Sequence, residues 1–189
     1  MKTINYDNYY WQNDKVRLRG MLPEDWEEHY YNCFDSAARR MLQYELELPP
    51  TIEKNQSDIE MFSNFKPETK RLMFTIESLD GENVGAFNLN SIDEKNGTFS
   101  IGIQVGIDHR GKGYGTAAMK LLLNYAFNER RLNKFNVSVI DGNVGSATMM
   151  EKLGCLNEGV VRQAIYTDGK YMDEILYGLT KDEFNEKNL

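Results

Sequence analysis

The sequence contains few of the residues that build cross-links or metal sites. Its 189 residues include two cysteines, Cys33 and Cys155, and two histidines. The cysteines lie in unrelated contexts, which excludes a disulfide framework and the paired spacing of a zinc site. We therefore predict no bound metal and a reducing compartment.

Long hydrophobic runs and an excess of positive charge are also missing. No run approaches the roughly 20 apolar residues that span a bilayer. The polar N-terminus lacks the apolar core of a signal peptide. The formal net charge is −7, which disfavours non-specific binding of nucleic acid. These absences predict a cytoplasmic protein whose partners include neither a membrane nor a nucleic acid.

What is present is enough to build one domain over residues 1–189. Hydrophobic residues make up 41% of the chain and aromatic residues 12%, which supports a sizeable core. No repeat, low-complexity segment or linker divides the sequence. We therefore expect a single domain of ordinary size.

The first third of the chain is predicted to be mostly helical after one short strand. Residues 14–19 alternate between apolar and polar side chains, which is typical of a strand. Pro23 is a preferred first-turn residue and begins a largely helical stretch over residues 24–45. Ser57 is predicted to cap another helix, with Glu60 as its capping-box partner.

The middle of the chain is predicted to form hairpins from Lys70 onward. Residues 80–81 (Asp-Gly) and 96–97 (Asn-Gly) suit tight hairpin turns and separate three alternating stretches. We therefore predict three successive antiparallel strands, of which the second covers residues 84–89 and the third residues 99–105.

The last third contains a crossover and a closing hairpin. A helix over residues 116–129 joins the third hairpin strand to a strand over 135–139, so those two strands must run parallel. Asn143 is predicted to cap a helix that stops at Gly154. A hairpin over residues 160–179 follows. This order predicts an α+β domain with a mixed sheet.

The segment from Arg110 to Gly115 is the most informative in the chain. It reads Arg-Gly-Lys-Gly-Tyr-Gly between a strand and a helix. Free N–H groups at a helix start, together with two cations, make a seat for phosphate. The nucleoside-triphosphatase motif is absent, and the glycines are spaced too closely for the dinucleotide motif. A glycine-rich turn without a ligand remains an alternative.

Segment 104–115 resembles the acetyl-CoA motif of the Gcn5-related N-acetyltransferases, the GNAT family. Asn143-x-x-Ser146, followed by residues 151–155, resembles the second motif of this family. Residues 16–25 and 158–171 resemble the opening and the closing hairpin of the branch that includes ribosomal-protein and spermidine acetyltransferases. The resemblance covers nearly the whole chain. It implies a central, mostly antiparallel sheet of six to seven strands, flanked by helices, with two parallel strands splayed at the cofactor site.

The resemblance also implies which residues bind acetyl-CoA. The loop N–H groups hold the pyrophosphate, and the pantetheine lies along the strand that precedes the loop. A backbone N–H near Val105 stabilises the oxyanion. Asn143 and Ser146 lie at the far side of the cofactor, although Asn143 is also explained as a helix cap. The cofactor-binding residues implied are Gln104, Val105, Gly106, Arg110, Gly111, Lys112, Gly113, Tyr114, Gly115, Thr116, Asn143 and Ser146.

The resemblance defines the general acid and the general base of the reaction less clearly. Many relatives use a tyrosine as acid where this chain has Met150, and methionine cannot donate a proton. Ser146 is one candidate donor, and three C-terminal tyrosines are others (Tyr166, Tyr171 and Tyr177). Relatives often carry a glutamate where this chain has Ser100, so Glu77 or a water is left as the base. Cys155 is interpreted as a packing residue.

The leading hypothesis is an N-acetyltransferase that moves an acetyl group from acetyl-CoA to a primary amine by direct attack. The acceptor is a small amine or polyamine, or a protein N-terminus, and it meets residues 24–65, where aromatic and acidic side chains suit a cation. A catalytically inactive coenzyme A-binding sensor or interaction module and a nucleotide-binding protein are alternatives. A homodimer is expected by analogy only.

Overall fold

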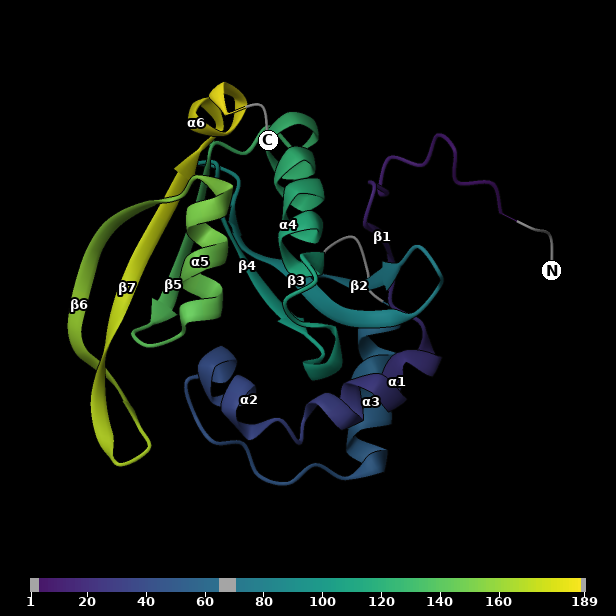
Figure 1. Cartoon of the computed structure of the whole chain (residues 1–189), viewed down its shortest axis with the longest axis horizontal. Coiled ribbons are helices and arrows are strands. Elements are labelled where there is room, and N and C mark those ends of the chain that lie inside the picture. The colour runs from purple at the N-terminus through teal and green to yellow at the C-terminus, as the bar shows by residue number, and fades with distance from the viewer. Residues whose placement is uncertain (1–3, 65–70, 188–189) are drawn as a thin grey trace.

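The computed structural model describes residues 4–64 and 71–187, and the predictions that extend to Phe65 and Lys70 lie outside these ranges. Its centre is a seven-stranded sheet with the order β1-β2-β3-β4-β5-β7-β6 (Figure 1). The strands are β1 (Val16–Gly20), β2 (Leu72–Ser78), β3 (Asn83–Asp93), β4 (Thr98–Val105), β5 (Lys134–Ile140), β6 (Leu156–Thr167) and β7 (Lys170–Thr180). The helices are α1 (Trp26–Asn32), α2 (Ser36–Gln43), α3 (Ile52–Ser63), α4 (Tyr114–Asn124), α5 (Val144–Leu153) and α6 (Lys181–Glu186).

The predicted α+β class and mixed sheet are confirmed. All neighbouring strands pair antiparallel except β4 and β5, which run parallel because α4 connects them. The parallel pair is joined only at its start, at Thr98–Lys134 and Phe99–Phe135. Beyond these positions β4 and β5 diverge. The expected splay between the two parallel strands is therefore present.

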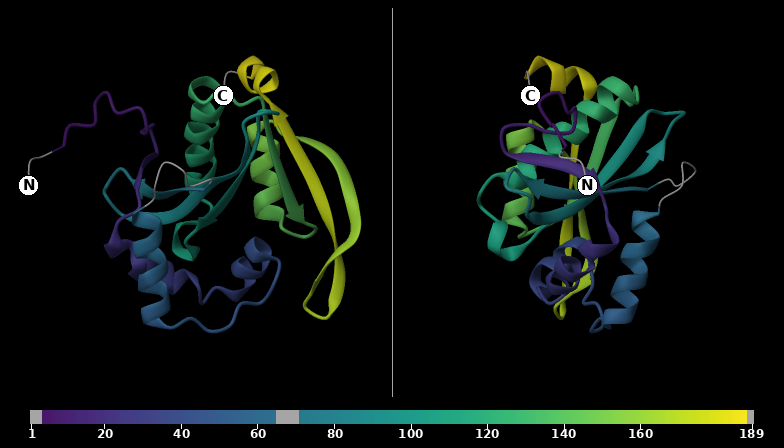
Figure 2. Two further views of the ribbon diagram at one scale, coloured as in Figure 1. Left: turned by 180° about the vertical axis from the view of Figure 1, so that it is seen from behind. Right: turned by 90° about the vertical axis from the view of Figure 1, so that its right-hand side faces the viewer.

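Two helical layers cover the sheet. Helices α4 and α5 lie on one face, and α1, α2 and α3 gather toward one end of the sheet (Figures 1 and 2). Alternate residues of β4 face opposite sides of the sheet. Phe99 and Ile101 are buried in the core, and Gln104 contacts α1 and α2. Four phenylalanines from the sheet, from the turn after α4 and from α6 contact one another in the core, with ring centroids 5.3 to 5.6 Å apart, namely Phe99, Phe127, Phe135 and Phe184.

The stretch over residues 24–45 is largely helical, as predicted, but it is divided into two helices. Asp35 leaves helical geometry and caps α2 by accepting a hydrogen bond from the Ala38 N–H. One prediction about the first helices is wrong. The next helix does not begin at Ser57. Thr51 is its cap and accepts from the Lys54 N–H, so Ser57 lies inside α3.

Boundaries elsewhere differ by a few residues. Strand β3 continues to Asp93, and α4 begins at Tyr114 rather than residue 116. The helix predicted to end at residue 129 finishes in a wider turn over Tyr125–Glu129. Helix α6 was not predicted, although Thr180 and Glu183 form a capping box at its start.

Candidate active site

The glycine loop forms a left-handed entry into α4. After a short 3-10 turn over Ile107–His109, Gly111 and Gly113 adopt φ angles of 74° and 87°. Gly113 is the N-cap of α4 and has no side chain to satisfy the helix start. The first intrahelical bond runs from the Ala117 N–H to the Gly113 carbonyl. The N–H groups of the preceding turn therefore remain available for an anion.

Three cationic side chains surround this loop. Arg110 donates to the Val105 carbonyl over 3.0 Å and pairs with Asp35 over 2.5 Å. Lys112 is exposed. The stem of Lys15 passes 3.7 Å from the position that a Cβ at Gly113 would take. These charges suit a pyrophosphate.

Asp35 connects the loop to α2. Burial alone would raise the pKa of Asp35, but the Ala38 N–H and the Arg110 guanidinium outweigh burial and lower this pKa. The carboxylate thus caps α2 and holds the first residue of the loop at the same time. Arg110 is therefore positioned between the glycine loop and α2.

The glycine loop lies at the open end of the splay, where β4 ends. Gly106 is buried, and the Ile103 and Val105 side chains lie against Gly115. Between Ser100 and Val105, the β4 edge that faces β5 has no strand partner. An extended ligand amide can pair with such an edge. This geometry fits the pantetheine arm expected along Gln104, Val105 and Gly106.

The Gln104 side chain points away from the glycine loop. Its Oε1 accepts from Arg39 over 3.0 Å, and its Nε2 donates to the Asn32 carbonyl over 3.2 Å. Buried Arg39 also pairs with Glu47. Only the backbone of Gln104 is thus placed to meet a ligand in the splay, while its side chain fixes the helices on the other side.

Asn143 and Ser146 stand at the start of α5. The Asn143 Oδ1 accepts from the Ser146 N–H over 3.1 Å, so Asn143 is a helix cap, as expected. Ser146 is partly buried, and its hydroxyl makes no hydrogen bond within the described part of the chain. The hydroxyl is therefore available to a ligand.

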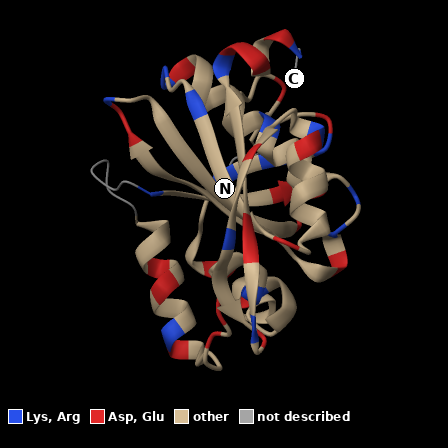
Figure 3. Ribbon diagram, turned by 90° about the vertical axis from the view of Figure 1, so that its left-hand side faces the viewer, with Lys and Arg blue, Asp and Glu red and all other residues tan. Residues whose placement is uncertain are grey.

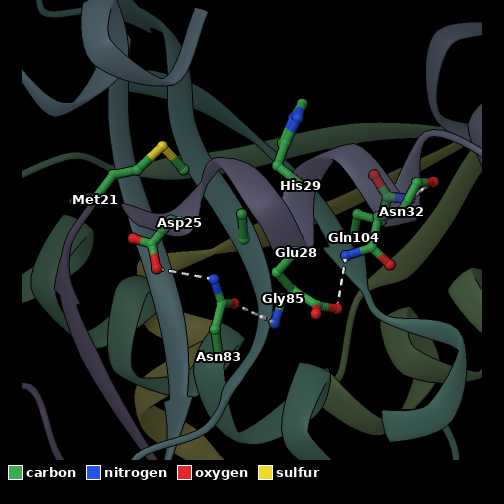
Figure 4. A pocket seen from close by; sticks show the side chains of 9 residues that line it. Met21, Asp25, Glu28, His29, Asn32, Asn83, Gly85 and Gln104 are labelled. Atoms are coloured by element: carbon green, nitrogen blue, oxygen red, sulfur yellow. Dashed lines mark hydrogen bonds between the residues drawn. The ribbon is translucent and has the colours of Figure 1, made fainter. Parts of the chain in front are cut away.

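Two cavities lie on the α1 side of the sheet. The smaller one, of about 20 Å³, has room for at most one water molecule and lies between Asp25 and Asn83 on one side and Glu28, Asn32 and Gln104 on the other (Figure 4). The larger one, of about 400 Å³, opens between α1, the α1–α2 junction and the turn before the glycine loop. Its lining consists of Glu28, Tyr31, Asn32, Phe34, Asp35, Ile107, Asp108 and His109.

The larger cavity is acidic and aromatic. Glu28, Asp35 and Asp108 contribute carboxylates, and Tyr31 and Phe34 are exposed rings. Asp35 is the carboxylate of the three that pairs with a cation, Arg110, within the described residues. In Figure 3 the Lys and Arg segments are interspersed with Asp and Glu, so the cavity is a local acidic feature of a mixed surface.

The candidate base Glu77 lies away from the splay. It belongs to β2, which β3 separates from β4. Its two carboxylate oxygens accept from Arg17 and Arg19 over 2.6 Å each. Both carboxylate oxygens are therefore already paired with guanidinium groups. Its role as base stays a prediction, without support from this placement.

The other residues considered for catalysis differ in how deeply their side chains are buried. Met150 is 1% exposed and packs in the core beside Cys155, whose thiol pKa burial raises to about 12. A buried thiol of this kind is inert, which agrees with a packing role. Tyr166 and Tyr171 are exposed on the β6–β7 hairpin, and Tyr177 is buried. Ser100 is partly buried on β4.

Sequence reasoning missed Lys15, Asp35 and Arg39. Each acts through a partner at least 65 residues away along the chain, at Gly113, Arg110 and Gln104 respectively. Of these three residues, only Asp35 had a signal in its neighbouring sequence, because Asp is a preferred residue at the start of a helix.

The family follows from these features together with direct comparison. Residues 15–156 match the model of the acetyltransferase (GNAT) domain. The chain belongs to the GNAT acetyltransferase family. It is therefore an acetyl-CoA-dependent N-acetyltransferase, as predicted.

Individual relatives support this assignment. An uncharacterized SPbeta prophage-derived N-acetyltransferase, YokL, of Bacillus subtilis is 31% identical over 93% of this chain and 95% of its own. The spermidine N(1)-acetyltransferase of Escherichia coli K12 is 27% identical over 85% of this chain and 83% of its own. The spermidine N-acetyltransferase of Vibrio cholerae in complex with CoA and spermine superposes with a TM-score of 0.79 at 17% identity, covering 92% of this chain and 99% of that one. At this identity the superposition shows the fold alone.

Among residues 4–64 and 71–187, no helix is long and apolar enough to cross a bilayer. No group of three or more His, Cys, Asp or Glu side chains there is arranged to hold a metal ion.

Proposed function

We propose that this GNAT enzyme transfers an acetyl group directly from acetyl-CoA to the primary amine of a small cationic molecule, a polyamine, or a protein N-terminus. The observation that carries the proposal is the splay of β4 from β5, with the glycine loop at its open end. Unpaired strand edges and free loop N–H groups suit the two halves of acetyl-CoA, its amide-bearing arm and its pyrophosphate.

The residues of the cofactor half have distinct roles in this proposal. The N–H groups from Arg110 to Thr116 hold the pyrophosphate, and Lys112 and Lys15 supply positive charge. The backbone of residues 104–106 orients the arm and places an N–H near the thioester carbonyl, where it stabilises developing negative charge. Ser146 and Asn143 lie at the far side of the arm, at the start of α5.

The larger cavity supports a cationic acceptor. It lies on the side of the sheet toward which the Gln104 side chain points, and it combines carboxylates with exposed rings. Carboxylates pair with ammonium groups, and aromatic faces attract them. Five of the eight residues that line the cavity fall in the segment, 24–65, in which the acceptor is expected from the sequence, and the other three are Ile107, Asp108 and His109.

A coenzyme A-binding sensor is the second candidate. Met150 favours it, because the position where many relatives carry the acid is buried and apolar in this chain. Family membership favours coenzyme A over the nucleotide-binding alternative. One domain over residues 1–189, a cytoplasmic location and a homodimer stay predictions.

Turnover against an amine panel tests the proposal. We expect free thiol to appear when the protein is mixed with acetyl-CoA and polyamines, aminoglycosides or N-terminal peptides. Mass spectrometry should show one added acetyl group on the acceptor amine. Tight binding of acetyl-CoA without thiol release above the amine-free rate, across all three classes, would instead establish the sensor.

Replacing Glu28 with glutamine tests the acceptor side. Glu28 lines both cavities, so we expect kcat/KM for a polyamine to fall about 10-fold, the effect of about 1.4 kcal/mol. The KM for acetyl-CoA should not change. Glu27→Gln is the matched control, because Glu27 is exposed and lines neither cavity. Equal effects of the two substitutions would show that only net charge matters.

A further inference from the structure

Tyr44 occupies an unusual backbone position at the end of α2. It has a φ of 66°, a left-handed conformation that non-glycine residues seldom adopt. Its N–H closes α2 by donating to the Arg40 carbonyl. The turn carries the side chain away from α2 and toward β5. Strained positions of this kind persist where surrounding contacts hold them.

The Tyr44 hydroxyl contacts β5 inside the splay. It donates to the Ser138 carbonyl over 3.1 Å and lies 2.7 Å from the Ser138 hydroxyl. Ser138 comes three positions after Phe135, the last β5 residue that pairs with β4. The hydroxyl therefore stands between the diverging strands, approaching from the face opposite α4 and α5.

Other contacts of α2 fix this placement. Arg39 binds Gln104 on β4, and Arg40 donates to the Thr167 hydroxyl at the end of β6. Asp35 holds Arg110 of the glycine loop. Helix α2 thus joins the loop, both sides of the splay and the tip of the hairpin. The last contact at this end of α2 is made by the Tyr44 hydroxyl, which carries a proton.

This chain also needs a proton donor, for which Ser146 at the start of α5 stays one candidate. Transfer to an amine breaks the bond between the acetyl carbon and sulfur, and the sulfur must end as a thiol. Met150 cannot donate. Of the three C-terminal tyrosines, two are exposed on the hairpin and one is buried.

We propose that Tyr44 is the general acid that protonates the departing sulfur of coenzyme A. The amine nitrogen forms a bond to the acetyl carbon as the carbon–sulfur bond breaks. The phenol proton passes to sulfur, and the proton lost from the nitrogen returns to the phenolate through the Ser138 hydroxyl or water. The products are the acetylated amine and the free thiol, so atoms and charge balance. This assignment rests on the proposed transferase function.

The surroundings keep the phenol protonated. Burial raises the pKa of Tyr44, the hydrogen bond with Ser138 lowers it, and the nearby charge of Glu174 raises it, with a net increase above the ordinary value. At neutral pH the hydroxyl therefore carries the proton that the reaction consumes. A general acid must still be protonated when the carbon–sulfur bond breaks.

Tyr44→Phe tests the proposal, because it keeps the ring and removes the proton. We expect kcat to fall about 100-fold at pH 7, at the lower end of the range for general acids, with the Kd for acetyl-CoA unchanged. The deficit should narrow as the pH rises past about 8.5, the ordinary pKa of a thiol, because the thiolate then leaves without a proton. Tyr9→Phe is the matched control, since its hydroxyl donates to the Leu18 carbonyl, a bond of the same kind.

Hydrolysis of acetyl-CoA in the absence of amine separates this proposal from the proposed function. Water then replaces the amine, and sulfur still requires a proton. Slower hydrolysis by Tyr44→Phe, with no amine turnover by the wild type, would support Tyr44 and overturn the transferase proposal. An unchanged kcat, a pH-independent deficit, or weaker binding of acetyl-CoA would overturn the assignment of Tyr44. No thiol release at all from the wild type would overturn both.

Discussion

Replacing Gly113 with glutamate is expected to raise the Kd for acetyl-CoA at least about 100-fold, a loss of about 2.7 kcal/mol. Gly113 is the N-cap of α4 and has a φ of 87°. A carboxylate there would occupy the positive end of the helix and repel the pyrophosphate that the free N–H groups are expected to bind. The left-handed backbone adds a strain of about 1–2 kcal/mol to the folded state, so Tm should fall modestly.

Isothermal titration with acetyl-CoA measures this effect, and Gly169→Glu is its control. Gly169 has a φ of 74° in the turn between β6 and β7, and no atom lies within 4 Å of the Cβ it would gain. The two variants therefore share the backbone strain and the added charge. An unchanged Kd in Gly113→Glu, or an equal loss in both variants, would refute a pyrophosphate seat at the loop.

The regular parts of the fold could be predicted because their signals are local. Alternation marks the strands, and the turns at Asp80-Gly81, Asn96-Gly97 and Asp168-Gly169 join the pairs β2–β3, β3–β4 and β6–β7. The parallel direction of β5 followed from the helix before it. Helix starts were harder, because several polar residues compete for a cap. Thr51 and not Ser57 is the N-cap of α3, and a helix that starts after Thr51 places Ile59 in the core.

The two halves of the candidate site also differ in how far apart their residues lie along the sequence. The proposed cofactor half is mostly local in sequence, since a single run of twelve residues provides the end of β4, the loop and the start of α4, while Asn143 and Ser146 come from elsewhere. The proposed acceptor half and the proposed acid depend on contacts between distant segments. Tyr44 meets Ser138 across 94 residues, and Arg40 meets Thr167 across 127. No periodicity encodes such pairs, so the sequence indicated a region for the acceptor but no contacts within it.

Asp25 is expected to be the residue with the largest polar contribution to stability. Its two oxygens accept from both terminal nitrogens of Arg19, the Leu22 N–H, the Thr75 hydroxyl and the Asn83 amide, over 2.8 to 3.0 Å. Asp25→Ala removes this partner from the Arg19 guanidinium, which is 23% exposed and keeps its pair with Glu77. Because Glu77 still compensates the charge, we expect a loss of about 3 kcal/mol, the lower end of the range for breaking a buried pair. Chemical denaturation at pH 7 measures the loss.

The pH dependence separates this ionic network from simple loss of packing. Burial alone would raise the pKa of Asp25, but bonds from Arg19, Leu22 and Thr75 outweigh burial and lower it. Its stabilisation is therefore complete above the unfolded-state pKa of about 3.9 and is lost as the pH falls through the lower folded-state value. The gap between wild type and Asp25→Ala should shrink below pH 4. Asp58→Ala, which breaks the exposed pair with Lys54, should cost less than about 1 kcal/mol. A gap that persists undiminished at pH 2 would show that Asp25 stabilises the fold by packing and not by its charge.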